Sequence, residues 1–203
     1  MEQPFATRFF SLYRLGPVRE LVGRWVFRGE TVEKLYDPHG ALGPYGDELP
    51  ADRFLDRLRA VPDTSLVEAP FVTRALLEAY RRTSYVATLP GGEVRIRIGE
   101  PQPMLKGSAW AFVTAENPGS ARELPREVNQ RRTRELAALL AGQWTAFPAR
   151  AIPDGQDWLV EHGFLIRDIP VQAAVDLGRS RGQNAIVSVE PDEPARLVLC
   201  FPE

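Results

Sequence analysis

The sequence predicts an α+β fold: a largely antiparallel sheet with helices packed mainly on one face, plus an irregular N-terminal extension. After residue 70, strand-like and helix-like segments follow one another in short blocks, and one pair of strand segments is separated by a Gly-Gly turn signal. Before residue 70, closely spaced prolines break the chain into short pieces. We therefore expect residues 1–69 to form an N-terminal extension or small subdomain and residues 70–203 to form the α+β domain.

Two elements are expected in the N-terminal part. GRWVFRGETVEKLYD, residues 23–37, is typical of a hairpin that turns at Arg28-Gly29-Glu30. ADRFLDRLRAV, residues 51–61, has its apolar residues at helical spacing. This part contains no group of polar residues that points to a ligand site. Its aromatic residues Trp25, Phe27 and Tyr36 are candidates for docking a protein partner if they are exposed.

The elements after residue 70 are longer. Helices are predicted over residues 71–83, 125–142 and 171–182, and strands over residues 85–90, 93–99, 110–115, 144–153, 158–169, 184–190 and 195–201. Gly91-Gly92 predicts the turn of a hairpin between the first two strands. The run WAFVTA does not alternate, which is typical of a central strand covered on both faces. Gly163 is expected to mark a β-bulge in its strand.

The composition narrows the classes of protein. The formal net charge is −2, so no overall positive field favours nucleic acid or an anionic membrane. Cys200 is the one cysteine, which excludes an intramolecular disulfide and fits a reducing compartment. The first residues do not have the pattern of a secretory signal, and no segment has the roughly 20 apolar residues that span a bilayer. We expect a cytoplasmic protein with no membrane partner.

The predicted helix over residues 125–142 places two polar residues on its apolar side. Measured from Val128 at about 100° per residue, the leucines of the stripe lie at about 20° (Leu139), 80° (Leu136) and 120° (Leu140). Arg132 lies at about 40° and Asn129 at about 100°, both inside this stripe. A buried arginine needs a carboxylate, backbone carbonyls or an anionic ligand. Glu135 is the local alternative, as an i,i+3 partner of Arg132.

The segment AWAFVTAENPGS, residues 109–120, is the most informative stretch for function. A predicted strand ends there in small polar residues, and the helix that carries Asn129 and Arg132 follows at once. Strand ends and helix starts leave backbone N–H groups free to bind a ligand. A turn that caps the next helix is the structural alternative.

Several separated motifs resemble one family. TAENP at residues 114–118, Asn129, PDG followed by Trp158 and Glu161, and GQNAI at residues 182–186 are similar, in order and spacing, to the bacterial domain of unknown function 3293 family over roughly residues 75–200. The resemblance implies these site positions: Thr114, Asn117, Pro118, Asn129, Trp158, Glu161, Gln183 and Asn184. It implies no established activity. The sequence departs from the family pattern at Glu116 and at Gly163, where a serine is expected, and this weakens any role for a serine nucleophile.

We expect these residues to form a small-molecule pocket. The ligand-binding candidates are Thr114, Asn117, Asn129, Arg132, Gln183 and Asn184, with Arg132 as a clamp for a carboxylate or phosphate. Glu161, in an otherwise apolar strand, is the candidate catalytic acid or base. The structural alternatives are an ion pair of Glu161 with Arg132, Arg150 or Arg167, and capping by Gln183 and Asn184.

Other chemistries have little support. The two histidines and the one cysteine do not have the spacing of metal ligands, so no metal site is expected. The sequence has no phosphate-loop or dinucleotide-binding motif, so no cofactor is expected. The first hypothesis is a small anionic or nucleotide-like ligand at the junction over residues 114–120. The alternative is a non-catalytic interaction module that docks a protein through residues 1–69. Nucleic-acid association ranks third, because glutamates offset the arginines of the central helix. Whether a reaction is catalysed stays open at the level of sequence.

Overall fold

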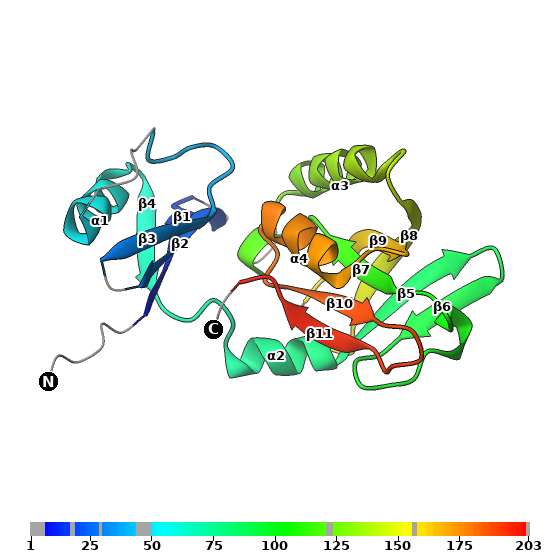
Figure 1. Ribbon diagram of the computed structural model, residues 1–203. Coiled ribbons are helices and arrows are strands. Elements are labelled where there is room, and N and C mark those ends of the chain that lie inside the picture. The colour runs from blue at the N-terminus through cyan, green and yellow to red at the C-terminus, as the bar shows by residue number, and fades with distance from the viewer. Residues whose placement is uncertain are drawn as a thin grey trace, which may run out of the picture. The chain divides into compact units, whose positions relative to one another are not determined.

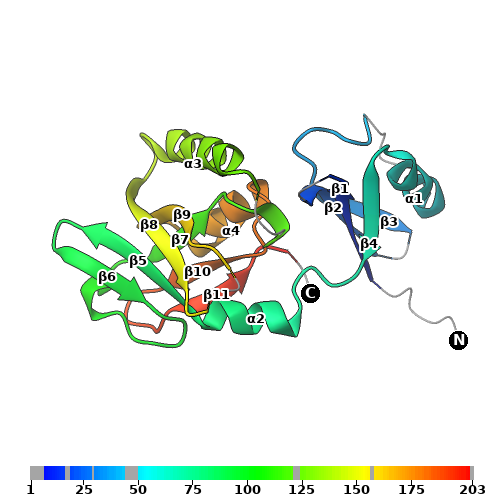
Figure 2. The same cartoon turned by 180° about the vertical axis from the view of Figure 1, so that it is seen from behind.

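A computed structural model describes residues 7–16, 19–28, 30–43, 50–120, 124–155 and 158–201. The chain divides into two compact units, residues 1–71 and residues 72–202, called unit 1 and unit 2 below. Figures 1 and 2 show the elements of each unit from two opposite sides. Of the helices in the described ranges, none has the length and apolar character that crossing a membrane requires.

Unit 1 is a four-stranded antiparallel sheet with one helix. Its elements are β1 (Arg8–Arg14), β2 (Glu20–Arg28), β3 (Thr31–Tyr36), α1 (Ala51–Ala60) and β4 (Thr64–Glu68). The strands follow the order β3-β2-β1-β4. Phe54 and Leu58 of α1 pack in one cluster with Phe10, Trp25 and Phe27 of the sheet. The predicted hairpin and helix are present, while Gly29 of the predicted turn lies outside the described residues.

Two expectations for unit 1 need correction. The segment expected to be irregular also contains β1 and β4, which pair with each other although about 50 residues separate them along the chain. The three aromatic residues considered as exposed docking candidates are buried: Trp25 is 0%, Phe27 2% and Tyr36 5% exposed. The apolar side of α1 needs an apolar sheet face to cover it, and Trp25 and Phe27 provide that face.

Unit 2 contains a seven-stranded antiparallel sheet in the order β11-β10-β7-β9-β8-β5-β6. Its elements are α2 (Arg74–Arg81), β5 (Thr83–Leu89), β6 (Gly92–Ile96), η1 (Pro103–Leu105), β7 (Trp110–Thr114), η2 (Pro118–Ser120), α3 (Arg126–Leu140), β8 (Thr145–Pro153), β9 (Glu161–Arg167), α4 (Val171–Ser180), β10 (Ala185–Val189) and β11 (Arg196–Leu199). Strand β7 lies inside the sheet and is buried along its whole length, as its continuous apolar run predicts. The α+β class is confirmed.

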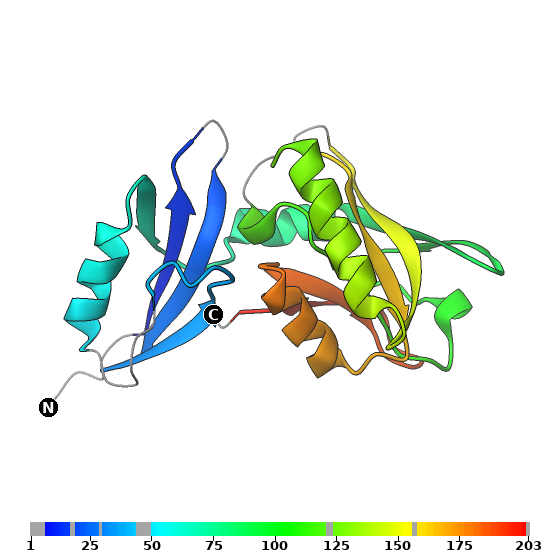
Figure 3. The same ribbon diagram turned by 90° about the horizontal axis from the view of Figure 1, so that it is seen from above.

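The two faces of this sheet are covered differently. One face carries an apolar cluster that includes Trp110, Phe112 and Val187. Helix α4 packs closely against the opposite side of β10, since a Cβ added at Gly178 would come within 2.8 Å of Ile186 Cγ2. Figure 3 shows α3 and α4 together over one side of the sheet, and Figure 1 shows α2 on the other side. Helices therefore lie mainly on one face, as expected.

The hairpin of β5 and β6 turns one residue earlier than expected. Leu89 pairs with Gly92, so the two residues of the turn are Pro90 and Gly91. Gly92, with a φ of 122°, is already the first residue of β6. A backbone angle that other residues rarely adopt explains a glycine at this position.

The predicted bulge at Gly163 is wrong. The pairing of β9 with β8 runs through Gly163, and its pairing with β7 ends at Gly163, both without a shift of register. A Cβ at this position would meet the carbonyl oxygen of Val113 and lie 3.0 Å from the Cα of Thr114. The glycine therefore permits a close approach between β9 and β7.

The buried stripe of α3 is shifted from the predicted one. Leu136 and Leu140 are 0% and 2% exposed, whereas Leu139 is 43% exposed. The buried side is therefore centred at roughly 100° instead of 60° on the same scale. Arg132 lies at the edge of this side and is partly buried, and Asn129 lies near its centre.

Candidate functional site

Strand β7 ends at Thr114 in a tight turn. The Thr114 Oγ1 donates a hydrogen bond to the carbonyl oxygen of His162 (2.7 Å) and accepts one from the backbone N–H of Glu116 (3.1 Å). Asn117 follows with a φ of 46°, in the left-handed region that asparagine tolerates better than most residues. The turn thus leads the chain out of the sheet and toward α3 while Thr114 ties it to β9.

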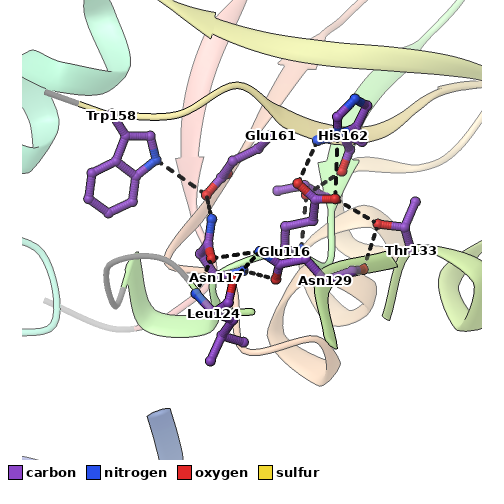
Figure 4. A network of polar contacts seen from close by, with 9 residues as sticks. Glu116, Asn117, Leu124, Asn129, Thr133, Trp158, Glu161 and His162 are labelled. Carbon is purple, nitrogen blue, oxygen red and sulfur yellow. Dashed lines mark hydrogen bonds and ion pairs between the residues drawn. The ribbon is translucent and has the colours of Figure 1, made fainter. Parts of the chain in front are cut away.

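Two asparagines lock this turn to α3. The Asn129 Oδ1 accepts from the backbone N–H of Asn117 (3.1 Å), and the Asn129 Nδ2 donates to the Asn117 Oδ1 (2.9 Å). The Asn117 Oδ1 also accepts from the backbone N–H of Leu124 (3.0 Å). Backbone donors settle which end of the Asn117 amide is oxygen, so its Nδ2 is the atom that points to Glu161. Figure 4 shows this network.

Glu161 begins β9 and has two unlike carboxylate oxygens. Its Oε1 accepts from the Asn117 Nδ2 (2.8 Å) and from the Trp158 Nε1 (3.3 Å). Its Oε2 has no hydrogen-bond donor among the described residues. Figure 4 shows Asn117 and Trp158 converging on the same oxygen.

Burial raises the pKa of the Glu161 carboxyl to about 7. The hydrogen bonds from Asn117 and Trp158 oppose this shift, and the charge of Glu116 adds to it. The described residues contain no ion-pair partner for Glu161, so the structural alternative, a pair with Arg132, Arg150 or Arg167, is not formed. Glu161 is therefore divided between its charged and neutral forms near neutral pH.

Glu161 lines a cavity of about 440 Å³ within unit 2. Four aromatic residues contribute to its wall: Tyr80, Tyr85, Phe112 and Trp158. They come from α2, β5, β7 and the segment before β9. Burial raises the pKa of Tyr85, which keeps its hydroxyl protonated, and this hydroxyl donates to the backbone oxygen of Tyr80 (3.3 Å). The cavity combines apolar surface with a few polar groups, as small-molecule sites do.

Ser120 ties the far end of the turn to this wall. The hydroxyl groups of Tyr80 and Ser120 lie 2.9 Å apart, and the Asn184 Nδ2 donates to the Ser120 Oγ (2.8 Å). Asn184 itself does not line the cavity, but it fixes a residue that does. The side chain of Asn184, a predicted ligand-binding residue, thus contacts the junction through Ser120.

Arg132 is held by the backbone and takes no part in the cavity wall. Its Nε donates to the carbonyl oxygen of Ala115 and its Nη2 to that of Arg181, both at 2.6 Å. Glu135, the expected local partner, instead lies 3.8 Å from Arg131 and 4.0 Å from Arg181. Arg132 joins the end of β7 to the end of α4, and backbone carbonyls satisfy its buried charge.

Gln183 extends from the end of α4 to the same turn. Its Nε2 donates to the backbone oxygen of Glu116 (2.7 Å), and the residue is 7% exposed and lines the cavity. The structure therefore places Thr114, Glu161 and Gln183 on the cavity wall. Behind them lie Asn117 and Asn129, which position Glu161.

Glu116 is the polar residue of this region that the sequence did not single out as a site. Its Oε1 accepts from the Thr133 Oγ1 (3.1 Å) and its Oε2 from the backbone N–H of His162 (2.9 Å). The His162 Nδ1 lies 3.5 Å from the Oε1. One signal was present: Thr133 lies one helical turn after Asn129 and so faces the same turn. Tyr80 and Tyr85 fall in the predicted helix over residues 71–83 and the predicted strand over residues 85–90, where no local pattern marks them as site residues.

The described residues contain no group of three His, Cys, Asp or Glu side chains arranged to hold a metal ion. The cavity residues offer hydrogen bonding and, through Glu161, acid–base chemistry.

Residues 113–186 match the model of the family described as "Protein of unknown function (DUF3293)". The match confirms the resemblance for this segment, which is shorter than the range of residues 75–200 over which the motifs were compared. It extends from β7 to the start of β10 and contains Thr114, Glu161 and Gln183. No curated protein and no solved structure matches the chain.

Proposed function

We propose that unit 2, which contains the segment matched by the family model, binds a small molecule in the cavity beside the 114–120 junction. One observation carries this proposal: Glu161 lines an aromatic cavity and has a carboxylate oxygen without a protein donor among the described residues. Burying a carboxylate in this way costs free energy unless a partner compensates it. A ligand in the cavity supplies that partner.

The shape of the ligand follows from the wall of the cavity. Tyr80, Phe112 and Trp158 offer aromatic surface against which a flat ring packs, and Glu161 offers an acceptor for ring N–H groups. These features support a nucleotide-like ligand, whose base would pack against the aromatic side chains and donate to Glu161. A small anion has less, because the guanidinium of Arg132 is already bound to two carbonyl oxygens.

A pKa of about 7 also suits Glu161 to donate or accept a proton near neutral pH. This supports the role of acid or base expected for it, with Asn117 as a positioning residue. We propose no particular reaction.

The setting we propose is the bacterial cytoplasm. Cys200 is buried, and as the single cysteine of the sequence it cannot form an intramolecular disulfide, which suits a reducing compartment. Docking of a protein through residues 1–69 is not proposed, since the aromatic residues that suggested it lie in the interior of the fold.

A thermal-shift screen of nucleosides, nucleotides, amino acids and phosphorylated metabolites tests the proposal. A ligand at about 100 times its Kd stabilises the protein by about 2.7 kcal/mol. We expect at least one compound to raise the Tm of the wild-type protein and to have little effect on Glu161→Gln. Glu135→Gln is the matched control, since it removes the same charge from an exposed position on α3. Equal shifts in the wild type and Glu161→Gln would place the ligand elsewhere, and no shift with any compound would refute the proposal.

A further inference from the structure

The two oxygens of the Glu161 carboxylate differ in their capacity for a further hydrogen bond. Asn117 and Trp158 both donate to Oε1, and the amide of Asn117 cannot turn away without losing its bond from the backbone of Leu124. The acceptor capacity of Oε1 is therefore largely used. A ligand in the cavity meets Oε2, which lacks a donor among the described residues.

The described part of the cavity wall carries charges of both signs, but its cation, Arg82, forms no ion pair with Glu161. The other titratable side chains on the cavity wall are Glu78, Tyr80, Arg82, Tyr85 and Asp154. Glu78 is bound to Arg81 (2.8 Å) and Asp154 to Arg97 (2.6 Å). Behind the wall, the charge of Glu116 raises the pKa of Glu161, and no described arginine or lysine lies within ion-pair distance of it. The group that would complement the Glu161 carboxylate is therefore a cation.

The aromatic residues favour the same kind of ligand. Tyr80, Tyr85, Phe112 and Trp158 line the cavity together with Glu161. The faces of aromatic rings attract cations, and the attraction is larger where water is displaced. A carboxylate next to several aromatic rings is thus complementary to a flat group that carries a positive charge.

We infer that the ligand of this cavity presents a protonated, planar nitrogen group, such as an amidinium or a protonated aminoheterocycle, to Oε2 of Glu161. The inference rests on the proposed function and specifies its ligand class. Planar N–H groups of this kind donate along the direction of a carboxylate oxygen while their flat surface packs against aromatic rings.

Binding of such a cation depends on pH. Only the ionised form of Glu161 pairs with it, and burial raises the pKa of this carboxyl to about 7. Raising the pH from about 6 to about 8 therefore increases the affinity about tenfold, as long as the ligand stays protonated. A neutral ligand that accepts a hydrogen bond from the protonated carboxyl of Glu161 shows the opposite trend.

Benzamidine and benzamide test the inference, because they have nearly the same shape and benzamidine alone is charged. The indole N–H signal of Trp158, identified by its loss in Trp158→Phe, reports on the contact beside Glu161 in ¹⁵N NMR spectra. We expect benzamidine to shift this signal and to bind at least about tenfold more tightly than benzamide, or about 1.4 kcal/mol. Glu161→Gln should remove this preference, and Glu135→Gln should keep it.

Three results would overturn the inference: equal affinity for the two compounds, an affinity for benzamidine that does not change between about pH 6 and pH 8, or no binding of benzamidine. The pH series uses the wild-type protein, so it remains decisive even if a variant folds poorly. A compound from the thermal-shift screen that needs Glu161 while benzamidine fails would refute the cationic ligand and leave the proposed function standing.

Discussion

Two carboxylates at the ends of neighbouring strands have opposite environments. Glu116 follows β7, its side chain is 7% exposed, and both of its oxygens accept hydrogen bonds, from Thr133 and from the backbone of His162. Glu161 begins β9 and lines the cavity, and within the described part of the chain the donors to it reach one oxygen only. A carboxylate with both oxygens occupied ties parts of the fold together. One with a single occupied oxygen is available to a ligand.

We expect the largest loss of stability from a substitution at the close contact between β7 and β9, the strands whose ends bear these carboxylates. Gly163→Ala places a methyl group against the carbonyl oxygen of Val113 and within 3.0 Å of the Cα of Thr114. Backbone atoms cannot give way cheaply, so we expect a loss of about 2–4 kcal/mol in the free energy of unfolding. Chemical denaturation measures it.

Gly91→Ala is the matched control for that substitution. A Cβ at Gly91 has nothing within 4 Å, so its effect should stay small. Similar losses for the two variants would show that the approach of β9 to β7 is not the reason for the glycine at position 163.

Removal of the tied carboxylate gives the next largest effect. Glu116→Ala leaves the backbone N–H of His162 without its acceptor and frees the Thr133 hydroxyl from one partner. We expect a loss of about 2–3 kcal/mol in the free energy of unfolding, and a smaller loss for Glu116→Gln, which keeps one acceptor oxygen. If Glu116→Ala were as stable as the wild type, the proposed division between the two carboxylates would be wrong.

Removal of the Glu161 carboxylate should increase stability, in contrast to removal of Glu116, and the increase should depend on pH. The pKa of Glu161 is raised from 4.5 to about 7 in the folded protein, so folding favours its protonated form. The stability that this proton confers is complete below about 4.5 and is lost as the pH rises to about 7. Relative to the wild type, Glu161→Gln should therefore gain about 1–3 kcal/mol between these pH values.

Urea denaturation of both proteins across this pH range measures the difference. Glu135→Gln, whose carboxylate is exposed on α3, should run parallel to the wild type. A constant difference between the wild type and Glu161→Gln would mean that the carboxyl titrates alike in the folded and unfolded protein.

The smallest effect is expected at the imidazole beside Glu116. The His162 side chain is 61% exposed and its Nδ1 lies 3.5 Å from the Glu116 Oε1, whereas the shorter contact uses the backbone N–H. His162→Ala keeps that N–H and should cost less than about 0.5 kcal/mol. A loss of stability near that of Glu116→Ala would mean that the imidazole, and not the backbone N–H, makes the important contact with Glu116.

The sequence predicted the elements whose pattern is local. Helical spacing located α1 and α3, and a continuous apolar run predicted the buried strand β7. The pairing of β1 with β4 was missed, because it joins segments about 50 residues apart and leaves no local pattern. The exposure of Leu139 was missed as well. A helical wheel gives the centre of all apolar residues, but α3 packs against the sheet through only one edge of that apolar side.

The candidate site was predicted in part. The motifs that resemble the family included Thr114, Glu161 and Gln183, which the structure places on one cavity. Arg132 was expected at the ligand and instead binds two carbonyl oxygens. Periodicity reports that a side chain faces inward, but the partner that it meets there depends on segments remote in sequence.

The sequence by itself determined the α+β class, the order of the elements in unit 2 and the junction at residues 114–120, because short-range patterns carry this information. Only the tertiary structure decided which carboxylate is occupied and which is available. Glu116 and Glu161 are equivalent as residue types, and each accepts two hydrogen bonds. Those of Glu116 are divided between its two oxygens, whereas both of those of Glu161 reach Oε1. How the donors around a buried carboxylate are distributed over its two oxygens is a property of the packed fold.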